Sequence, residues 1–454
     1  MFVYVRVYYE IDQICSFPLS SRHSQKNTNT NFFYFSQNLF CLFQSSIDSS
    51  IGLYKRNHVS ILDSIIIIMS LASIKQQQGQ QSFTPLHVCI TGSSQGIGLA
   101  AAQRLIQNGH VVYHACRNKE RAQQAVKIAG GGIPMVCDLA DFRSVRRFAQ
   151  TLDRIAPKLD VLCLNAGIAP ASSIAPSSSS TSLSTTTSPP PPPPVLPKLT
   201  QQGYEECVGV NHLGHFLLAN LLVNKLSQHG GGRLVVTASS VHDPATKGGR
   251  SGQEGLGATL GDVSGLGVDL RRQQGPTKKD EEDRPCMVDG STTYHTGKVY
   301  KDSKLCNVLM SRRAVHEFPP SVSTVAFNPG LVPTTGLFAS LRNENPWKAR
   351  ALTWIATLTG VAVPLQVAGD RLVYMATATI VDTTTTTTMA ADENDETQAR
   401  MYLTNGSYFS APVKCRGTTP ADGFVQTAVS EDASNDLLAK TLWEKSWRIV
   451  QDWI

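Results

Sequence analysis

From residue 86 onward, short apolar runs typical of buried strands alternate with longer runs that have the apolar spacing of helices. The strand-like runs cover residues 86–92, 110–117, 133–139, 159–167, 231–240 and 322–330. Such alternation predicts a parallel sheet with helices on both faces, because each strand must cross over through a helix to pair in parallel. We therefore expect a Rossmann-type, doubly wound α/β fold.

Three stretches interrupt the alternation without ending it. Residues 171–199 are rich in Ser, Thr and Pro, residues 243–290 are Gly-rich and charged, and residues 383–396 open on a threonine tract. Low-complexity chain of this kind buries too little apolar surface to offset the entropy of ordering. We expect three flexible insertions in a single domain, residues 85–454.

The first 84 residues have a different composition. The first seventy contain only four acids, Glu10, Asp12, Asp48 and Asp63, and many Ser, Asn, Phe and Tyr residues. An acid-poor, hydroxyl-rich leader is typical of an organelle transit segment, although a disordered extension preceding a second start at Met69 would look the same. The location is then an organelle in the first case and the cytoplasm in the second.

Charge and cysteine content exclude some classes of function. Lys and Arg number 41 against 35 Asp and Glu, and a net charge of +6 does not call for a nucleic-acid partner. The ten cysteines have no regular spacing, which favours buried free thiols over disulfides or a metal site. No uninterrupted apolar run reaches about twenty residues, so we expect a soluble protein or one in peripheral contact with a membrane.

The stretch TGSSQGIG, residues 91–98, lies between the first predicted strand and the first predicted helix. Glycines there permit a tight turn, close approach of a phosphate and packing of the helix against the strand, while the helix N-terminus favours an anion. A dinucleotide is the expected ligand at this place in a parallel sheet. The residues assigned to it are Gly92, Ser94, Gly96, Ile97 and Gly98.

The end of the second strand indicates which dinucleotide is bound. An NAD site usually carries an acid here for the ribose hydroxyls, whereas this chain has Arg117 and, four residues on, Arg121. Two guanidinium groups suit a 2′-phosphate, so the expected cofactor is NADPH.

A tyrosine and a lysine stand four residues apart in YKDSK, residues 300–304. A helix places Tyr300 and Lys304 on one face. The lysine charge favours the phenolate and would bring the tyrosine, whose pKa is otherwise about 10, into range as an acid–base catalyst.

Together, TGSSQGIG, the Asn-Ala-Gly of residues 165–167 and YKDSK resemble the short-chain dehydrogenase/reductase superfamily. The resemblance implies that Tyr300 protonates the substrate while nicotinamide delivers hydride, and that Lys304 also binds the nicotinamide ribose. It implies that Ser239, or its neighbour Ser240, orients the substrate carbonyl and that Asn211 completes a proton path through water. It further places five residues around the cofactor: Asp138, Leu139, Asn165, Ala166 and Gly167. Asp138 is also a candidate helix cap, and the two roles are compatible.

The blocks GVNHLGHFLLANLL, MVDGSTTYHTGKVYKDSKLCN and PTTGLF, with the long insertion between Ser239 and Tyr300, resemble the light-dependent protochlorophyllide reductase branch. Two positions depart from it. Leu331 stands where the branch has a cysteine thought to assist protonation, and Gly167 stands where it often has alanine.

Three functions remain open on the sequence. An NADPH-dependent protochlorophyllide-type reductase in a plastid is favoured, an NADPH-dependent carbonyl or retinal-type reductase is the alternative, and a non-catalytic nucleotide-binding protein is the third. The expected partner is a small molecule, either a tetrapyrrole or a carbonyl compound. We interpret His212 and His215 as packing or pocket residues without a metal, and Cys306 as a core thiol.

Overall fold

The computed structural model describes residues 84–170, 196–250, 256–271, 284–338, 342–343, 345–381 and 403–454. The predicted leader lies outside these ranges except for Thr84. The predicted insertion 383–396 lies outside them entirely, and so does most of the insertion 171–199. The chain from Thr84 to Ile454 forms one compact unit.

An eight-stranded sheet forms the centre of that unit, in the order β10-β9-β6-β5-β4-β1-β2-β3. Its strands are β1 (His87–Thr91), β2 (Val111–Cys116), β3 (Ile133–Val136), β4 (Val161–Leu164), β5 (Gly232–Thr237), β6 (Val322–Phe327), β9 (Tyr408–Ser410) and β10 (Val425–Gln426). All neighbours pair in parallel except β10, which runs antiparallel to β9. Strands β7 (Ile380–Val381) and β8 (Leu403–Thr404) form a separate parallel pair. The predicted doubly wound α/β fold is confirmed.

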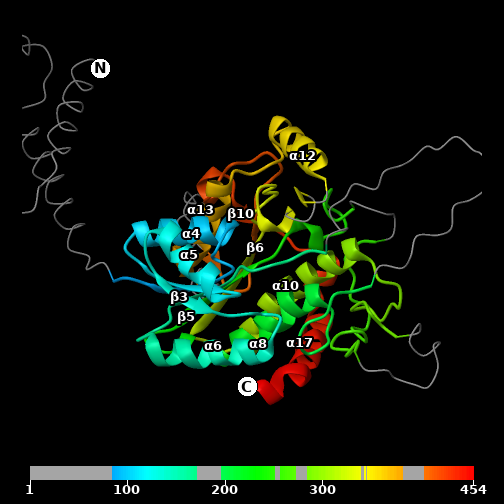
Figure 1. Cartoon of the computed structure of the whole chain (residues 1–454), viewed down its shortest axis with the longest axis horizontal. Helices are drawn as coiled ribbons and strands as arrows, with labels where there is room; N and C mark the ends of the chain where they lie inside the picture. The colour runs from blue at the N-terminus through cyan, green and yellow to red at the C-terminus, as the bar shows by residue number, and fades with distance from the viewer. Residues whose placement is uncertain are drawn as a thin grey trace, which may run out of the picture. The chain divides into compact units, whose positions relative to one another are not determined.

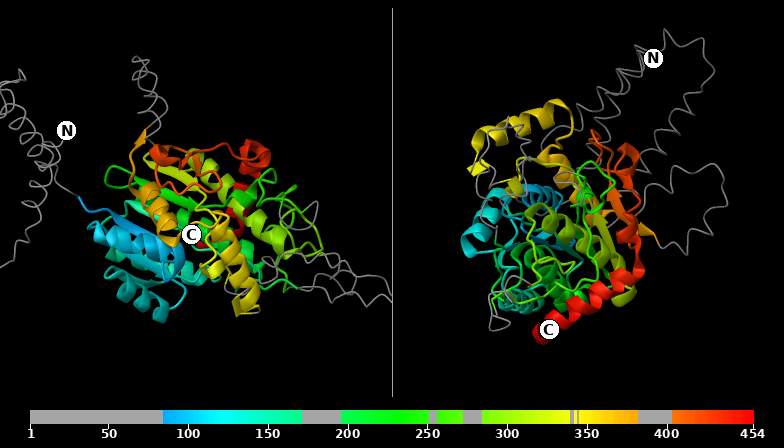
Figure 2. Two further views of the ribbon diagram at one scale, coloured as in Figure 1. Left: turned by 90° about the horizontal axis from the view of Figure 1, so that it is seen from above. Right: turned by 90° about the vertical axis from the view of Figure 1, so that its right-hand side faces the viewer.

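Helices cover both faces of the sheet (Figures 1 and 2). One face carries α4 (Gly96–Gln107), α5 (Lys119–Ala129) and α13 (Leu365–Thr377). The other face carries α6 (Phe142–Ile155), α8 (Gly214–Leu226) and α10 (Thr296–Glu317). The remaining helices are α7 (Glu206–Val208), α12 (Pro346–Leu358), α16 (Glu431–Ser434) and α17 (Asp436–Val450).

Local sequence explains where these elements start and stop. Every residue of β4 is buried, as expected of a central parallel strand. Helix α5 is preceded by Asn118, whose side chain accepts a hydrogen bond from the Arg121 N–H, and is followed by Gly130, which has φ of 80°. Helix α6 is capped in the same way by Asp141.

Two elements have features that the apolar runs of the sequence do not indicate. The helical segment that precedes β5 begins at Glu206 and passes through a π-helical turn, Gly209–Leu213, before α8. At the other end of the chain, β9 lies inside the sheet and the two-residue strand β10 forms its edge.

The insertion 243–290 also differs from the flexible segment expected there, in the parts that are described. Leu260, Val263 and Met287 are at most 1% exposed and belong to the main core. Lys445 of α17 donates a hydrogen bond from Nζ to the Val263 carbonyl. Apolar residues spaced among the glycines thus give this segment a buried face, which its overall polar composition conceals. Within the described ranges, no helix has both the length and the apolar character needed to cross a bilayer.

Candidate active site

The predicted site residues gather at one edge of the sheet because parallel strands all end there. Gly92 follows β1, Arg117 follows β2, Asn165 follows β4 and Ser239 lies two residues after β5. This edge is the expected position of a ligand site in a doubly wound sheet.

The glycine loop is shaped by close contact with the turn after β4. Gly92 and Gly96 have φ angles of 68° and 60°, a conformation that residues with a side chain rarely adopt. A Cβ on Gly92 would lie 2.9 Å from Ala166 Cα, and one on Gly98 would lie 2.5 Å from Asn165 Nδ2. The role expected for Gly98, packing of helix on strand, is therefore joined by a tighter constraint from the Asn165 side chain.

The N-terminus of α4 is open to an anion. No side chain caps it, and its first turn contains no acidic residue. Ser94 is half-buried in the preceding loop, whereas Ile97 packs against the cluster of Val332, Val363 and Ala368. Backbone N–H groups at such a helix start bind phosphate groups, so the glycine loop fits a dinucleotide pyrophosphate.

Arg117 and Arg121 are both exposed at the carboxyl end of β2. The Arg121 backbone N–H donates to Asn118 Oδ1 at 3.0 Å, which anchors the start of α5. Among the described residues, no hydrogen bond or ion pair involves either guanidinium. Two free cations therefore flank the place where the adenosine end of a dinucleotide would lie.

Thr91 joins the glycine loop to the turn after β4. Its Oγ1 accepts hydrogen bonds from the N–H groups of Asn165 and Ala166, at 2.9 and 3.0 Å. The Asn165 side chain donates from Nδ2 to the Thr91 carbonyl at 2.9 Å. These three bonds fix the Asn165-Ala166-Gly167 turn relative to β1.

Asn211 lies in the π-helical turn and is fully buried. Its Nδ2 donates to the Ile168 carbonyl at 2.9 Å and to Ser303 Oγ at 3.0 Å, and its Oδ1 accepts from the Ile168 N–H at 2.9 Å. A π-helical turn re-aims side chains and is frequent at functional sites. Here it connects the turn after β4 with α10.

Tyr300 and Lys304 lie one turn apart on α10, and Lys304 Nζ is 5.7 Å from the centre of the Tyr300 ring. Nζ donates to the Thr237 carbonyl at the end of β5, at 3.2 Å. A Cβ on Gly167 would lie 3.5 Å from Lys304 Nζ and 3.6 Å from Asn211 Oδ1. The structure thus brings together Tyr300, Lys304, Asn211 and the Asn-Ala-Gly turn.

The electrostatics of this pair differ from the expectation. Burial lowers the pKa of Lys304 to about 8. Burial, followed by the nearby Cys207 thiol, raises the pKa of Tyr300 instead of lowering it. Desolvation is the largest cause of both pKa shifts.

Ser239 caps the short helical turn Ser240–His242, and its Oγ accepts from the Val241 N–H at 3.4 Å. Its carbonyl accepts from His242 Nδ1 at 2.7 Å. Helix α10 packs against both β5 and this turn. Ser239 therefore lies between the strand and the helix that carry the remaining groups.

Asp138 accepts a hydrogen bond at Oδ1 from the Ala140 N–H, at 3.1 Å. The helix-cap prediction for it is wrong, since Asp141 caps α6. Leu139 is 5% exposed, and its carbonyl lies 2.5 Å from the place of a Cβ on Gly214.

The two histidines beside Asn211 are buried for different reasons. His212 Nε2 is 2.8 Å from Ser446 Oγ, so His212 packs on α17. His215 donates from Nδ1 to the Asn211 carbonyl at 3.1 Å, which leaves its Nε2 to accept from the Thr91 hydroxyl at 2.9 Å. Burial lowers the pKa of His215 to about 4, and this keeps the imidazole neutral, as that pairing requires.

Sequence reasoning missed several neighbours of the site. Thr335 lies over the glycine loop, with Cγ2 3.5 Å from the place of a Cβ on Gly96. Gly336 is in close contact with the Gln95 side chain. Both belong to PTTGLF, a block quoted for its resemblance alone. Nothing in the sequence pointed to the Cys207 thiol, which accepts from Asn211 Nδ2 at 3.4 Å.

Leu331 follows β6, and its carbonyl accepts from the Val363 N–H at 2.7 Å. Its side chain packs against the cluster of Phe338 and Ala349. Cys306 is fully buried in the core. No group of three metal-binding side chains occurs among the described residues.

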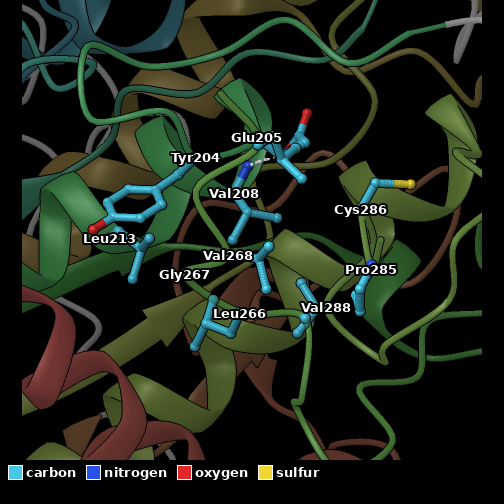
Figure 3. Close-up of a pocket in the computed structure, with 12 residues that line it drawn as sticks. Tyr204, Glu205, Val208, Leu213, Leu266, Gly267, Val268, Pro285, Cys286 and Val288 are labelled. Carbon is cyan, nitrogen blue, oxygen red and sulfur yellow. Dashed lines mark hydrogen bonds between the residues drawn. The ribbon is translucent and has the colours of Figure 1, made fainter. Parts of the chain in front are cut away.

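A separate pocket lies between the segment leading to Asn211 and the insertion 243–290 (Figure 3). The insertion supplies Leu266, Val268 and Val288, and the facing wall includes Glu205, as Figure 3 shows. Glu205 is 8% exposed, accepts at Oε1 from the Tyr294 hydroxyl at 2.8 Å, and has its pKa raised by burial. None of the predicted catalytic or cofactor residues lines this pocket.

Comparison with known proteins adds to these observations. The short chain dehydrogenase family model matches residues 86–249. Protochlorophyllide reductase A of Oryza sativa subsp. japonica, named chloroplastic, is 36% identical over 278 residues, which cover 59% of this chain and 63% of that protein. Protochlorophyllide reductase A of Hordeum vulgare, also named chloroplastic, is 34% identical over 305 residues, which cover 65% of this chain and 70% of that protein. Protochlorophyllide reductase of Avena sativa is 37% identical over 262 residues, which cover 55% of this chain and 72% of that protein.

Proposed function

Because this chain belongs to the short-chain dehydrogenase/reductase superfamily of oxidoreductases, with protochlorophyllide reductases among its relatives, we propose that it is an NADPH-dependent reductase of a protochlorophyllide-type tetrapyrrole. The observation that carries this proposal is the placement of Lys304 Nζ against both the Tyr300 ring and Gly167. It supports a reaction centre where a nicotinamide would meet a proton donor.

The glycine loop supports the dinucleotide half of the proposal. The α4 N-terminus would hold the pyrophosphate, and Arg117 and Arg121 would bind the 2′-phosphate that distinguishes NADPH from NADH. When bound, NADPH supplies the hydride. Asp138 and Leu139 would border the adenine, and the residues Asn165, Ala166 and Gly167 would border the rest of the cofactor.

The proton comes from this chain. We assign its transfer to the Tyr300 hydroxyl, which burial keeps protonated at neutral pH. Lys304 would stabilise the phenolate that remains and bind the ribose hydroxyls of the cofactor. Ser239 would orient the substrate. Asn211, held by Ile168 and Ser303, would support return of a proton through water.

A carbonyl reductase of the same superfamily is the second candidate. Leu331 favours it, since an apolar side chain packed with Phe338 offers no thiol to assist protonation of a pigment. The matching blocks and the relatives favour the pigment reductase. The chloroplastic names of those relatives and the acid-poor leader support a plastid as the location.

Light and dark assays separate the two. Protein mixed with NADPH and protochlorophyllide should lose the substrate absorption band on illumination and keep it in the dark. Reduction of aldehydes in the dark, without a change in the pigment spectrum, would favour the carbonyl reductase.

A further inference from the structure

Helix α10 carries a second set of charged side chains. Lys298 and Asp302 lie on the side of the helix opposite Tyr300, and Lys301 lies between that side and the side of Lys304. These three residues are at most 6% exposed. None of them has a role in the proposed reaction, yet two of them lie between its tyrosine and its lysine. Buried charges of this kind need partners, and their partners lie in the segment 243–290.

Lys298 and Asp302 hold the middle and the end of that segment. Lys298 Nζ forms ion pairs with Asp302 Oδ2 at 2.6 Å and Asp289 Oδ2 at 3.0 Å, and donates to the Thr259 carbonyl at 2.8 Å. Asp302 Oδ1 accepts from the Thr259 N–H at 3.1 Å. One turn of α10 therefore binds both polar backbone groups of Thr259.

Lys301 holds the start of the segment. Its Nζ donates to the carbonyls of Gly249 and Leu256, at 2.9 Å each. With Thr259 and Asp289, this makes four attachment points spread along the described parts of the segment.

A contribution to folding stability does not by itself explain this cluster of buried charges. A buried ion pair often contributes no more stability than apolar residues of the same volume, and in some proteins its role is instead to specify one geometry. The segment begins four residues after Ser239, ends ten residues before Tyr300 and leads into α10. Its attachment to α10 therefore bears on how those two residues face each other.

We infer that Lys298, Lys301 and Asp302 are positioning residues, which clamp the described parts of the segment 243–290 onto α10 and so hold Ser239 in register with Tyr300. The inference rests on the proposed function for the roles of Ser239 and Tyr300. The clamp itself rests on the contacts above.

The first experiment separates positioning from general stability. In Lys298→Met, we expect kcat to fall about tenfold or more, since small displacements of reacting groups are costly, while the NADPH dissociation constant stays within about twofold. The matched control is Lys440→Met, which removes a lysine from an exposed pair on α17 and should change neither. Parallel losses of kcat and NADPH affinity in Lys298→Met, or no loss of kcat, would overturn the inference.

The second experiment does not need activity. Limited trypsin digestion, mapped by mass spectrometry, should cut at Lys247, Arg250 and Arg271 faster in Lys301→Met than in the wild type. Lys301→Arg should restore protection, and Lys440→Met should match the wild type. Equal cleavage rates in all four proteins would refute the clamp.

Failure of the clamp can be told apart from failure of the proposed function. If Lys298→Met does not fold, the milder Lys301→Met carries both measurements. If the wild type turns over neither pigment nor aldehyde, the proposed function fails, and the clamp is decided by the proteolysis alone.

Discussion

Arg117 is the residue on which the choice of cofactor depends. It is exposed, and no described residue competes for its guanidinium. Arg117→Asp should weaken NADPH binding by about 10- to 100-fold, the effect of losing a charge-assisted hydrogen bond of roughly 1.5–3 kcal/mol. NADH binding should change little. Fluorescence titration with both nucleotides measures this, and unchanged NADPH affinity would remove the assignment.

The control for that titration is Arg146→Asp. Arg146 is an exposed arginine of α6, on the opposite face of the sheet. The Arg146→Asp substitution changes the net charge by the same amount, but far from the end of β2. The NADPH affinity of this variant should therefore equal that of the wild type.

The lowered pKa of Lys304 leads to a prediction about the pH dependence of the reaction. With a pKa lowered to about 8 by burial, its ammonium loses its charge as pH rises through about 8. The phenolate left by proton transfer is then no longer stabilised, so kcat/KM for NADPH-dependent reduction should fall above that pH. Lys304→Arg keeps its charge and should lack this falling limb, even at lower overall activity. A flat wild-type profile from pH 7 to 10 would contradict the role given to Lys304.

At the scale of elements, the glycine loop and the turn after β4 behave as one unit. Gly98→Ala would place a methyl group 2.5 Å from Asn165 Nδ2 and 2.8 Å from the Gly92 carbonyl. Such overpacking typically costs about 1–3 kcal/mol. We expect a lower melting temperature and weaker NADPH binding.

Gly297→Ala provides the matched change for comparison. It is also a helical glycine, but a Cβ there would meet nothing within 4 Å. Alanine should be neutral or stabilise α10 by up to about 1 kcal/mol. Equal effects of the two substitutions would show that the contact with Asn165 does not constrain the loop.

Elements and site were predictable to different degrees from the sequence. The order and type of β1 to β6 follow from local apolar runs, and so does the placement of Gly92 and Arg117 at strand ends. The π-helical turn at Asn211 does not, because it depends on hydrogen bonds to Ile168 and Ser303 from distant parts of the chain. The position of β9 inside the sheet depends likewise on β10, a two-residue strand without a pattern of its own.

The burial of individual residues was the property that the sequence predicted least well. The charges of YKDSK suggested a lowered tyrosine pKa, but the chain packed around Tyr300 raises it. The insertion 243–290 looked flexible by composition, yet its described parts contribute to the core. Both differences arise from long-range packing, which a local pattern does not contain.

At the scale of the whole molecule, Leu331 tests which branch of the superfamily the chemistry follows. For a pigment reductase, Leu331→Cys should raise the rate of photoreduction, since a missing aid to proton transfer commonly costs about a hundredfold or more. For a carbonyl reductase, Leu331 is an apolar wall of the pocket, and the same variant should leave aldehyde reduction nearly unchanged. Parallel assays in light and dark distinguish the two patterns.

The central claim is that Tyr300 supplies the proton in a light-dependent, NADPH-driven reduction. Illumination of the wild type and of Tyr300→Phe, each saturated with NADPH and mixed with protochlorophyllide, tests it most directly through the loss of the substrate absorption band. The account predicts loss of the band in the wild type and a rate lower by about a hundredfold or more in Tyr300→Phe, with NADPH binding unchanged. A wild type that leaves the band intact in the light, or a Tyr300→Phe variant as fast as the wild type, would contradict it.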